Sequence, residues 1–362
     1  MKQCFAYCSL FLKDYQIEKE VLIKLWMAQG FIKLLGQNQC LEDVGLEYFM
    51  ELLWRSFFQE VEENWWDDVP KFKIHDLMHD LAISVVGLEN ITFGINGENI
   101  GEKAHHVSFG SNLGSSLKIP TLLFKANRMR TFLLPSQVWH PCQVVWNQSR
   151  VWNQSTCDTF VSSFKLLRLL DLNGTGISSV PHSIGKLKLL RYLNLSGNNS
   201  IKMLPNFITR LHNLETLNLS CCRGLIELPK IFTKLVNHKH LNIDGCWSLT
   251  HMPLGLGQLT NLQSLVKYVL STDSRRGGEL KELHGLNHLR ENLRIKSLRH
   301  DKDTELECKA TSLKDKQHLE GLALEWIKGD VDEVDVGYDK KSIEALEQPL
   351  ILNIWNYKAT WE

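Results

Sequence analysis

Residues 190–198 read Leu-Arg-Tyr-Leu-Asn-Leu-Ser-Gly-Asn, and the leucine spacing in this stretch decides the fold. The alternation Leu-x-Leu has a period of two, which predicts a short strand with both leucines on the same side. The closing asparagine turns the chain out of the strand, because its small polar side chain bonds backbone groups that a ladder leaves unpaired. A unit this short cannot bury its leucines alone, so it must stack on neighbouring units.

The same pattern occurs in three further copies, which are Leu167, Leu170, Leu172 and Thr175; Leu214, Leu217, Leu219 and Cys222; and His238, Leu241, Ile243 and Cys246. Four prolines keep a period of 24 residues: Pro181, Pro205, Pro229 and Pro253. Proline suits a return arm, where no ladder N–H is needed. Chance leucines in an ordinary helical core would not keep one period, so the sequence predicts a leucine-rich-repeat solenoid. This is an α/β fold, a parallel-strand horseshoe that works as a binding surface rather than a reaction vessel.

The residues between the inward leucines must face the concave wall of the horseshoe. Three columns of them form the predicted partner-binding set: Leu169, Tyr192, Thr216 and His240; Asp171, Asn194, Asn218 and Asn242; Asn173, Ser196, Ser220 and Asp244. One interpretation is a solvated polar face, which every such solenoid has. The other is protein recognition, for which Tyr192 and His240 are the best anchors.

Composition sets the limits on partners and compartment. The 362 residues include 41 basic and 41 acidic side chains, so no net charge favours nucleic acid or an anionic membrane. The apolar runs are too short to span a membrane. Nine cysteines are an odd number without framework spacing, which indicates free thiols and a cytoplasmic location. The predicted partners are therefore proteins.

The chain divides into four predicted stretches. Residues 1–86 are helical and rich in aromatic residues, and 87–163 are a linker with an irregular first repeat. Residues 164–270 hold the regular repeats, and 271–362 hold irregular, truncated repeats.

The first stretch predicts helices followed by a hairpin. One amphipathic helix ends at Gly30 and a second runs from Val44 to Phe58. Apolar runs at 57–61 and 72–74 flank an acidic turn at 62–68. Helices followed by a hairpin predict a winged-helix unit, and an acidic turn in place of a basic wing argues against DNA binding.

Two motifs in this stretch carry a family resemblance. Residues 2–32, from Lys-Gln-Cys-Phe-Ala-Tyr-Cys to Leu-Trp-Met-Ala-Gln-Gly-Phe-Ile, closely resemble the winged-helix part of plant nucleotide-binding leucine-rich-repeat (NB-ARC) disease-resistance proteins. Residues 74–82, Ile-His-Asp-Leu-Met-His-Asp-Leu-Ala, resemble the Met-His-Asp motif of that family, assigned to Met78, His79 and Asp80. The tryptophan of Lys24-Leu25-Trp26-Met27 favours the coiled-coil branch, and residues 314–326 are similar to a segment between its repeats.

The resemblance implies a plant intracellular immune receptor that is not an enzyme. In that family ADP holds the switch domain closed, exchange for ATP couples to defence signalling, and the repeats bind pathogen effectors or guarded host proteins. The first repeats also pack on the switch. Carried over, the cofactor-binding residues are His79, whose imidazole N–H would reach the ADP phosphate, and Asp80, which would fix the local geometry. Without the resemblance, His79 would be interpreted as a histidine on a helix surface.

The sequence departs from the family pattern in its phosphate site. It contains no Gly-x-x-x-x-Gly-Lys-(Ser/Thr) loop, and the family's magnesium-binding acidic strand is missing. Leu12 stands where the family usually has proline. We therefore expect a fragment with an incomplete ADP/ATP site.

Two alternatives remain open at this point. The chain could be a stand-alone intracellular repeat scaffold without nucleotide control. His75 and His79, four residues apart with Asp76 beside the first, also imitate a His-Glu-x-x-His zinc pattern, which would need a third ligand.

Overall fold

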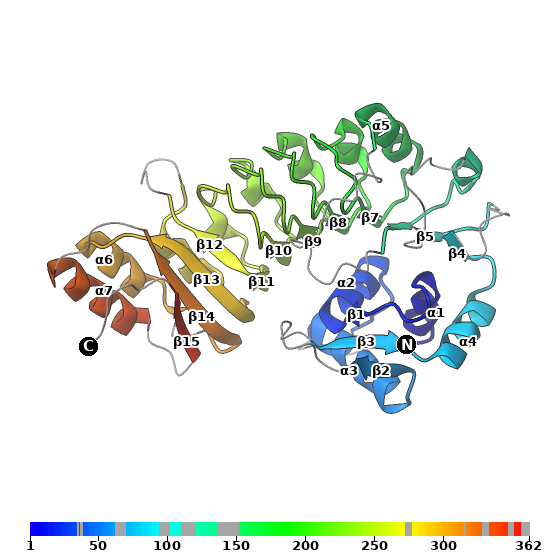
Figure 1. Cartoon of the computed structure of the whole chain (residues 1–362), viewed down its shortest axis with the longest axis horizontal. Helices are drawn as coiled ribbons and strands as arrows, with labels where there is room; N and C mark the ends of the chain where they lie inside the picture. Colours follow the sequence, from blue (N-terminus) through cyan, green and yellow to red (C-terminus); the bar gives the residue numbers. More distant parts are fainter. Residues whose placement is uncertain are drawn as a thin grey trace. The chain divides into compact units, whose positions relative to one another are not determined.

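The computed structural model describes residues 1–34, 36, 39–61, 70–93, 102–109, 121–135, 152–271, 277–313, 316–327, 333–346 and 351–355 (Figure 1). The acidic turn at 62–68 lies outside them. The chain divides into two compact units. Unit 1 is Met1–Thr175 with Lys186–Asn194, and unit 2 is Gly176–Gly185 with Leu195–Glu362.

Unit 1 begins with the winged-helix unit that the sequence predicts. Its elements are α1 (Lys2–Tyr7), η1 (Cys8–Leu10), β1 (Ile17–Glu18), α2 (Lys19–Gln29), α3 (Leu41–Trp54), β2 (Phe58–Val61), β3 (Lys71–Ile74) and α4 (Asp76–Val86). The strands form an antiparallel sheet in the order β1-β3-β2. Helix α2 ends at Gly30 with a φ of 76°, a left-handed C-cap that confirms the predicted helix end.

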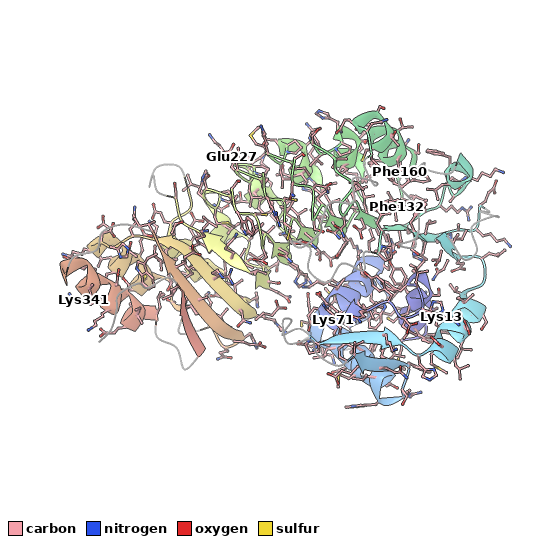
Figure 2. The ribbon with its side chains drawn as sticks, viewed as in Figure 1. Lys13, Lys71, Phe132, Phe160, Glu227 and Lys341 are labelled. Carbon is pink, nitrogen blue, oxygen red and sulfur yellow. The ribbon has the colours of Figure 1, made fainter. Side chains whose placement is uncertain are left out.

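Parallel strands follow in the same unit. They are β4 (Asn90–Phe93), β5 (His106–Phe109), β6 (Thr131–Leu133), β7 (Leu169–Asp171) and β8 (Tyr192–Asn194), paired in chain order. Turn η2 (Thr121–Lys125) and helix α5 (Gln154–Ser163) lie between them in the sequence. Phe132 of β6 packs on Phe160 of α5, with ring centroids 4.4 Å apart (Figure 2). The ladder therefore starts within the stretch predicted as a linker with an irregular first repeat.

Unit 2 contains the later repeats. Strands β9 (Thr216–Asn218), β10 (His240–Asn242) and β11 (Ser264–Leu265) are parallel, and a second parallel sheet holds β12 (Lys267–Val269), β13 (Glu291–Leu298), β14 (Leu319–Trp326) and β15 (Ile351–Trp355). The return arms are η6 (Asn206–Arg210), η7 (Phe232–Lys234), η8 (Leu256–Gln258), η9 (Leu280–Gly285), α6 (Lys302–Ala310) and α7 (Glu333–Leu346), while η5 (His182–Lys186) falls at the boundary between the units in the sequence.

The return arms η6 and η7 start at their prolines, as predicted. The Pro205 carbonyl accepts the Ile208 N–H at 3.1 Å, and the Pro229 carbonyl accepts the Phe232 N–H at 2.9 Å. Proline thus opens a 3₁₀ turn where its missing N–H costs nothing. The later arms differ, because η8 begins after its N-cap residue Gly255, and η9 and α6 begin without a proline.

The turn residues bond backbone groups, as the sequence pattern predicts. Asn198 Nδ2 donates to the Leu195 carbonyl at 2.8 Å. The thiol of Cys222 donates to that same carbonyl, and the thiol of Cys246 donates to the Leu219 carbonyl, each at 3.1 Å. Burial raises the pKa of the Cys222 thiol to about 12, which keeps this donor protonated.

Seven described cysteines are free thiols, namely Cys4, Cys8, Cys40, Cys157, Cys222, Cys246 and Cys308. Cys221 departs from the expected free thiols because it is disulfide-bonded. Among the described helices, none combines the length and apolar character needed to cross a membrane.

Candidate functional site

His79 lies on α4 and is buried, with only 1% of its surface exposed. Its Nε2 is 2.7 Å from the carbonyl oxygen of Phe11. A carbonyl only accepts, so Nε2 carries the proton and the histidine ties α4 to the chain after η1. Its Nδ1 is buried without a hydrogen-bond partner in the described structure. His79 is therefore neither a surface histidine nor one whose bonded N–H is open to a ligand.

Asp80 is exposed and pairs with a lysine rather than with His79. Its carboxylate lies 2.8 Å from the ammonium of Lys13, whose hydrogen bond and charge lower the pKa of Asp80 (Figure 2 labels Lys13). The distance from His79 Nδ1 to Asp80 Oδ1 is 3.9 Å, too long for a hydrogen bond. Asp80 thus does not orient the imidazole of His79.

His75 is a histidine that the sequence reasoning did not assign to the nucleotide site. Strand β3 ends at Ile74 and α4 begins at Asp76, so His75 is the N-cap residue, and its Nδ1 accepts the Leu77 N–H at 3.3 Å. The ring is half-buried, and its Nε2 has no hydrogen-bond partner in the described part of the chain. The strand-to-helix junction before it was the signal that could have identified it.

A phosphate needs N–H donors that it can reach, and this requirement separates the two histidines. His75 stands at the N-terminus of an 11-residue helix, where backbone N–H groups and the helix dipole favour anions. His79 does not meet the requirement, because its ring is buried and its Nε2 proton is bonded to the Phe11 carbonyl. A Gly-rich phosphate loop is missing from the sequence, so the residues present fit a nucleotide only in part.

The zinc alternative gains no support from the geometry. Within the described ranges, no three His, Cys, Asp or Glu side chains lie together as metal ligands. His75 caps α4 while His79 points to Phe11, so the two rings serve different partners.

The first concave column is covered in unit 1. Leu169 and Tyr192 belong to one buried apolar cluster with Leu133 and the winged-helix core, including Trp26 and Phe49. Tyr192 is 4% exposed, and burial raises the pKa of its phenol. Tyr192 is therefore too buried to act as an anchor for another protein. Helix α2 packs on β7 and β8 instead (Figure 1).

The second column shapes the ends of the strands. The side-chain oxygens of Asp171, Asn218 and Asn242 each accept the backbone N–H two residues later, at 2.9 to 3.0 Å. Such Asx turns bend the chain out of the strand.

The rest of the predicted partner-binding set differs in exposure. Four residues, Asn173, Asn218, Asn242 and Asp244, are half-buried and keep accessible surface. The others are buried: Leu169, Asp171, Tyr192, Asn194, Ser196, Thr216, Ser220 and His240. His240, predicted as an anchor, is 5% exposed.

One exposed aromatic residue was missed by the sequence reasoning. Trp247, on the turn after β10, is 65% exposed and lies under the guanidinium of Arg223, 4.7 Å from the ring centroid. Tryptophan and arginine are the side chains most often found at the energetic centres of protein interfaces. Because Trp247 lies outside the repeat columns, its exposure was not apparent from the period.

Two family models match this chain. The disease resistance protein winged helix domain matches residues 10–82, and a leucine-rich repeat region matches residues 149–357. The solved structures that resemble it include a leucine-rich-repeat protein of Leptospira interrogans, 18% identical, with a TM-score of 0.36 over 70% of this chain and 73% of that one.

Similar curated proteins come from plants. The disease resistance protein RGA1 of Solanum bulbocastanum is 43% identical over 96% of this chain and 30% of its own length. Another from Arabidopsis thaliana, At3g14460, is 37% identical over 91% of this chain and 22% of its own length. RGA2 of Solanum bulbocastanum is 49% identical over 30% of this chain and 11% of its own length. The chain thus spans less than a third of each of these relatives.

Proposed function

Because this chain belongs to the plant disease-resistance proteins that join a winged-helix domain to a leucine-rich-repeat region, we propose that it is a non-enzymatic part of an immune receptor. In this proposal unit 2 recognises another protein in the cytoplasm, either a pathogen effector or a guarded host protein. The winged helix then passes that event to a nucleotide-controlled switch.

The observation that carries the proposal is the shared core of unit 1. Leu133, Leu169 and Tyr192 from three successive repeat strands are buried with the winged-helix residues. The phenol of Tyr7 in α1 also lies 3.2 Å from the hydroxyl of Thr131 in β6. A packed interior has low compressibility, so a displacement of the first repeats would move the winged helix with them.

The accessible residues of unit 2 supply the recognition surface in this proposal. They are Trp247 with Arg223 above it, and the half-buried polar residues Asn218, Asn242 and Asp244. An aromatic anchor beside polar groups is the usual composition of a protein-binding patch. Small molecules usually bind in concave pockets, so this surface suits a protein better.

We expect Trp247→Ala to weaken partner binding by about tenfold or more, because truncating an interface tryptophan costs about 2 kcal/mol or more. Leu254→Ala is the matched control, since Leu254 is also an exposed apolar residue of unit 2, at 51%. Both variants should keep the melting temperature of the parent. The measurement is the infection-triggered defence response of plants expressing each variant. Equal responses of the parent and both variants would contradict this recognition surface.

Nucleotide control is the second part of the proposal, and His75 is its candidate residue rather than His79. In a full-length receptor with a nucleotide-binding domain, we expect His75→Ala to release ADP faster at an unchanged melting temperature. His79→Ala should instead lower the melting temperature, because it leaves the buried Phe11 carbonyl without its donor. Faster ADP release from His79→Ala alone, at full stability, would restore the carried-over role of His79. Unchanged release in both would favour the stand-alone scaffold.

A further inference from the structure

Three arginines stand in a row across unit 1. Arg130, Arg168 and Arg191 each directly precede a strand, namely β6, β7 and β8. The N–H of Arg168 donates to the Arg130 carbonyl and the N–H of Arg191 donates to the Arg168 carbonyl, each at 2.8 Å. Neighbouring strands lie about 4.8 Å apart, so the three side chains start from adjacent rungs of one ladder. All three are half-buried.

Two arginines of this row, Arg130 and Arg168, have no carboxylate partner among the described residues. Arg168 donates from Nη1 to the Gln29 carbonyl at 2.6 Å, which uses one of its five N–H groups, and neither residue forms an ion pair in the described structure. The guanidiniums of Arg168 and Arg191 come to the same place, each 3.8 Å from where a Cβ on Gly30 would stand.

The electrostatic surroundings of Arg130 and Arg168 agree with this excess of positive charge. Burial lowers the pKa of Arg168, and the charges of Arg130 and Arg191 lower it further. Burial, with His105, Arg130 and Arg168, also lowers the pKa of His106 to about 3, so this neighbour stays neutral. An anion placed here would relieve the mutual repulsion of the arginines.

A second, independent observation lies at the same point. Gln29, the last residue of α2, is 3% exposed, and neither Oε1 nor Nε2 of its amide has a hydrogen-bond partner among the described residues. The backbone carbonyl of Gln29 is the one that accepts the hydrogen bond from Arg168. Buried amides are almost always bonded, and an orphaned one calls for an unseen partner. This amide belongs to the residue whose backbone carbonyl binds Arg168, and it offers one donor group and one acceptor.

We propose that Arg130, Arg168 and Gln29, with Arg191 beside them, bind a small soluble ligand that carries two or more phosphate groups and a hydroxyl. Guanidinium matches phosphate oxygens in paired hydrogen bonds, and a row of them favours several phosphates over a single carboxylate. The hydroxyl would donate to Gln29 Oε1, and a phosphate oxygen would accept from Nε2. Such a ligand would fasten α2 to the first repeats. This site is separate from the recognition surface of unit 2.

The test is calorimetric titration of the whole chain with fructose 1,6-bisphosphate and with pyrophosphate, in a buffer of constant ionic strength. We expect saturable one-site binding, tighter for the hydroxylated bisphosphate, and a melting temperature that rises with ligand. Arg130→Gln and Arg168→Gln should each weaken binding about tenfold or more. Arg128→Gln removes the same charge from an exposed side chain nearby and should leave binding unchanged.

Further experiments separate specific binding from other outcomes. Gln29→Leu should abolish the preference for the hydroxylated ligand while the folded chain stays intact. Vesicles with a bisphosphorylated lipid headgroup should not co-sediment with the chain, and binding to vesicles but not to the soluble ligands would overturn a soluble ligand. The lack of saturable binding, or equal losses in Arg128→Gln and Arg168→Gln, would overturn the site.

Discussion

His238 shows at the scale of one residue how a repeat position tolerates an unfavourable side chain. It fills the position held by Leu167, Leu190 and Leu214 in other repeats, and it is fully buried. Its Nδ1 lies 3.3 Å from the Leu214 carbonyl, while its Nε2 has no hydrogen-bond partner within the ranges that the structure describes. Burial lowers the pKa of His238 to about 3. The unfolded chain, with a histidine pKa near 6.5, therefore binds more protons between pH 6.5 and 3. The contribution of His238 to stability is complete above pH 6.5 and is lost as the pH falls through that window.

We expect His238→Leu to stabilise unit 2 by about 1 kcal/mol at pH 7, because it removes a buried unpaired nitrogen. The gain should grow at pH 5, since the variant has lost one buried group that must be protonated in acid. Urea unfolding at both values measures the difference. A variant that is no more stable than the parent at pH 5 would contradict the account. The period alone marked His238 as an inward position, but the tautomer and its orphaned nitrogen needed coordinates.

At the scale of the element, the turns between repeats fit together without room for a side chain. A Cβ on Gly285 in η9 would collide with the backbone carbonyl of Gly257 in η8, and a Cβ on Gly257 would lie 2.5 Å from the carbonyl oxygen of Glu282. Backbone atoms cannot yield as the tip of a side chain does. Gly285→Ala should therefore destabilise unit 2 by about 1–3 kcal/mol.

Gly337→Ala in α7 is the control, because nothing lies within 4 Å of its Cβ position and alanine is the better helix former. It should leave stability unchanged or raise it slightly in the same urea unfolding experiment. Equal effects of the two substitutions would show that the turns are not in close contact. The proline series reaches only the first of these arms, because η9 lies in the stretch of irregular repeats, and the sequence contains no sign of which glycines meet. That depends on the distance between neighbouring turns, which the period does not contain.

At the scale of the whole molecule, residues of the first repeats complete the hydrophobic core of the winged helix. Because Leu133, Leu169 and Tyr192 belong to that cluster, a chain ending at residue 93 would leave apolar winged-helix surface in water. We expect the chain 1–93 to unfold at a lower temperature than the chain 1–194, which keeps β6 to β8. Thermal unfolding followed by near-ultraviolet circular dichroism would measure this, and equal midpoints would refute the shared core.

The sequence predicted the fold class, but it did not predict that the winged helix buries residues of β6 to β8. The leucine period, the helix end at Gly30 and the hairpin followed from local patterns, and those predictions are confirmed for the described elements. The bounds predicted for the second helix, Val44 to Phe58, are wrong, because α3 ends at Trp54 and Phe58 begins β2. The burial of Tyr192 and His79 depends on which surfaces of unit 1 pack together. The repeat pattern predicts only that a side chain points away from the core of the solenoid. The resemblance carried the site to His79, although the local N-cap geometry distinguishes His75.

The shared core also constrains how such chains can be recombined. A crossover that joined one winged helix to the first repeats of another gene would pair unmatched surfaces at Tyr192 and Leu169. An exchange after residue 194 would leave the cluster intact and replace only later repeats. Folded chimaeras between relatives should therefore have most of their breakpoints beyond β8, where an exchange leaves the shared core of unit 1 unchanged.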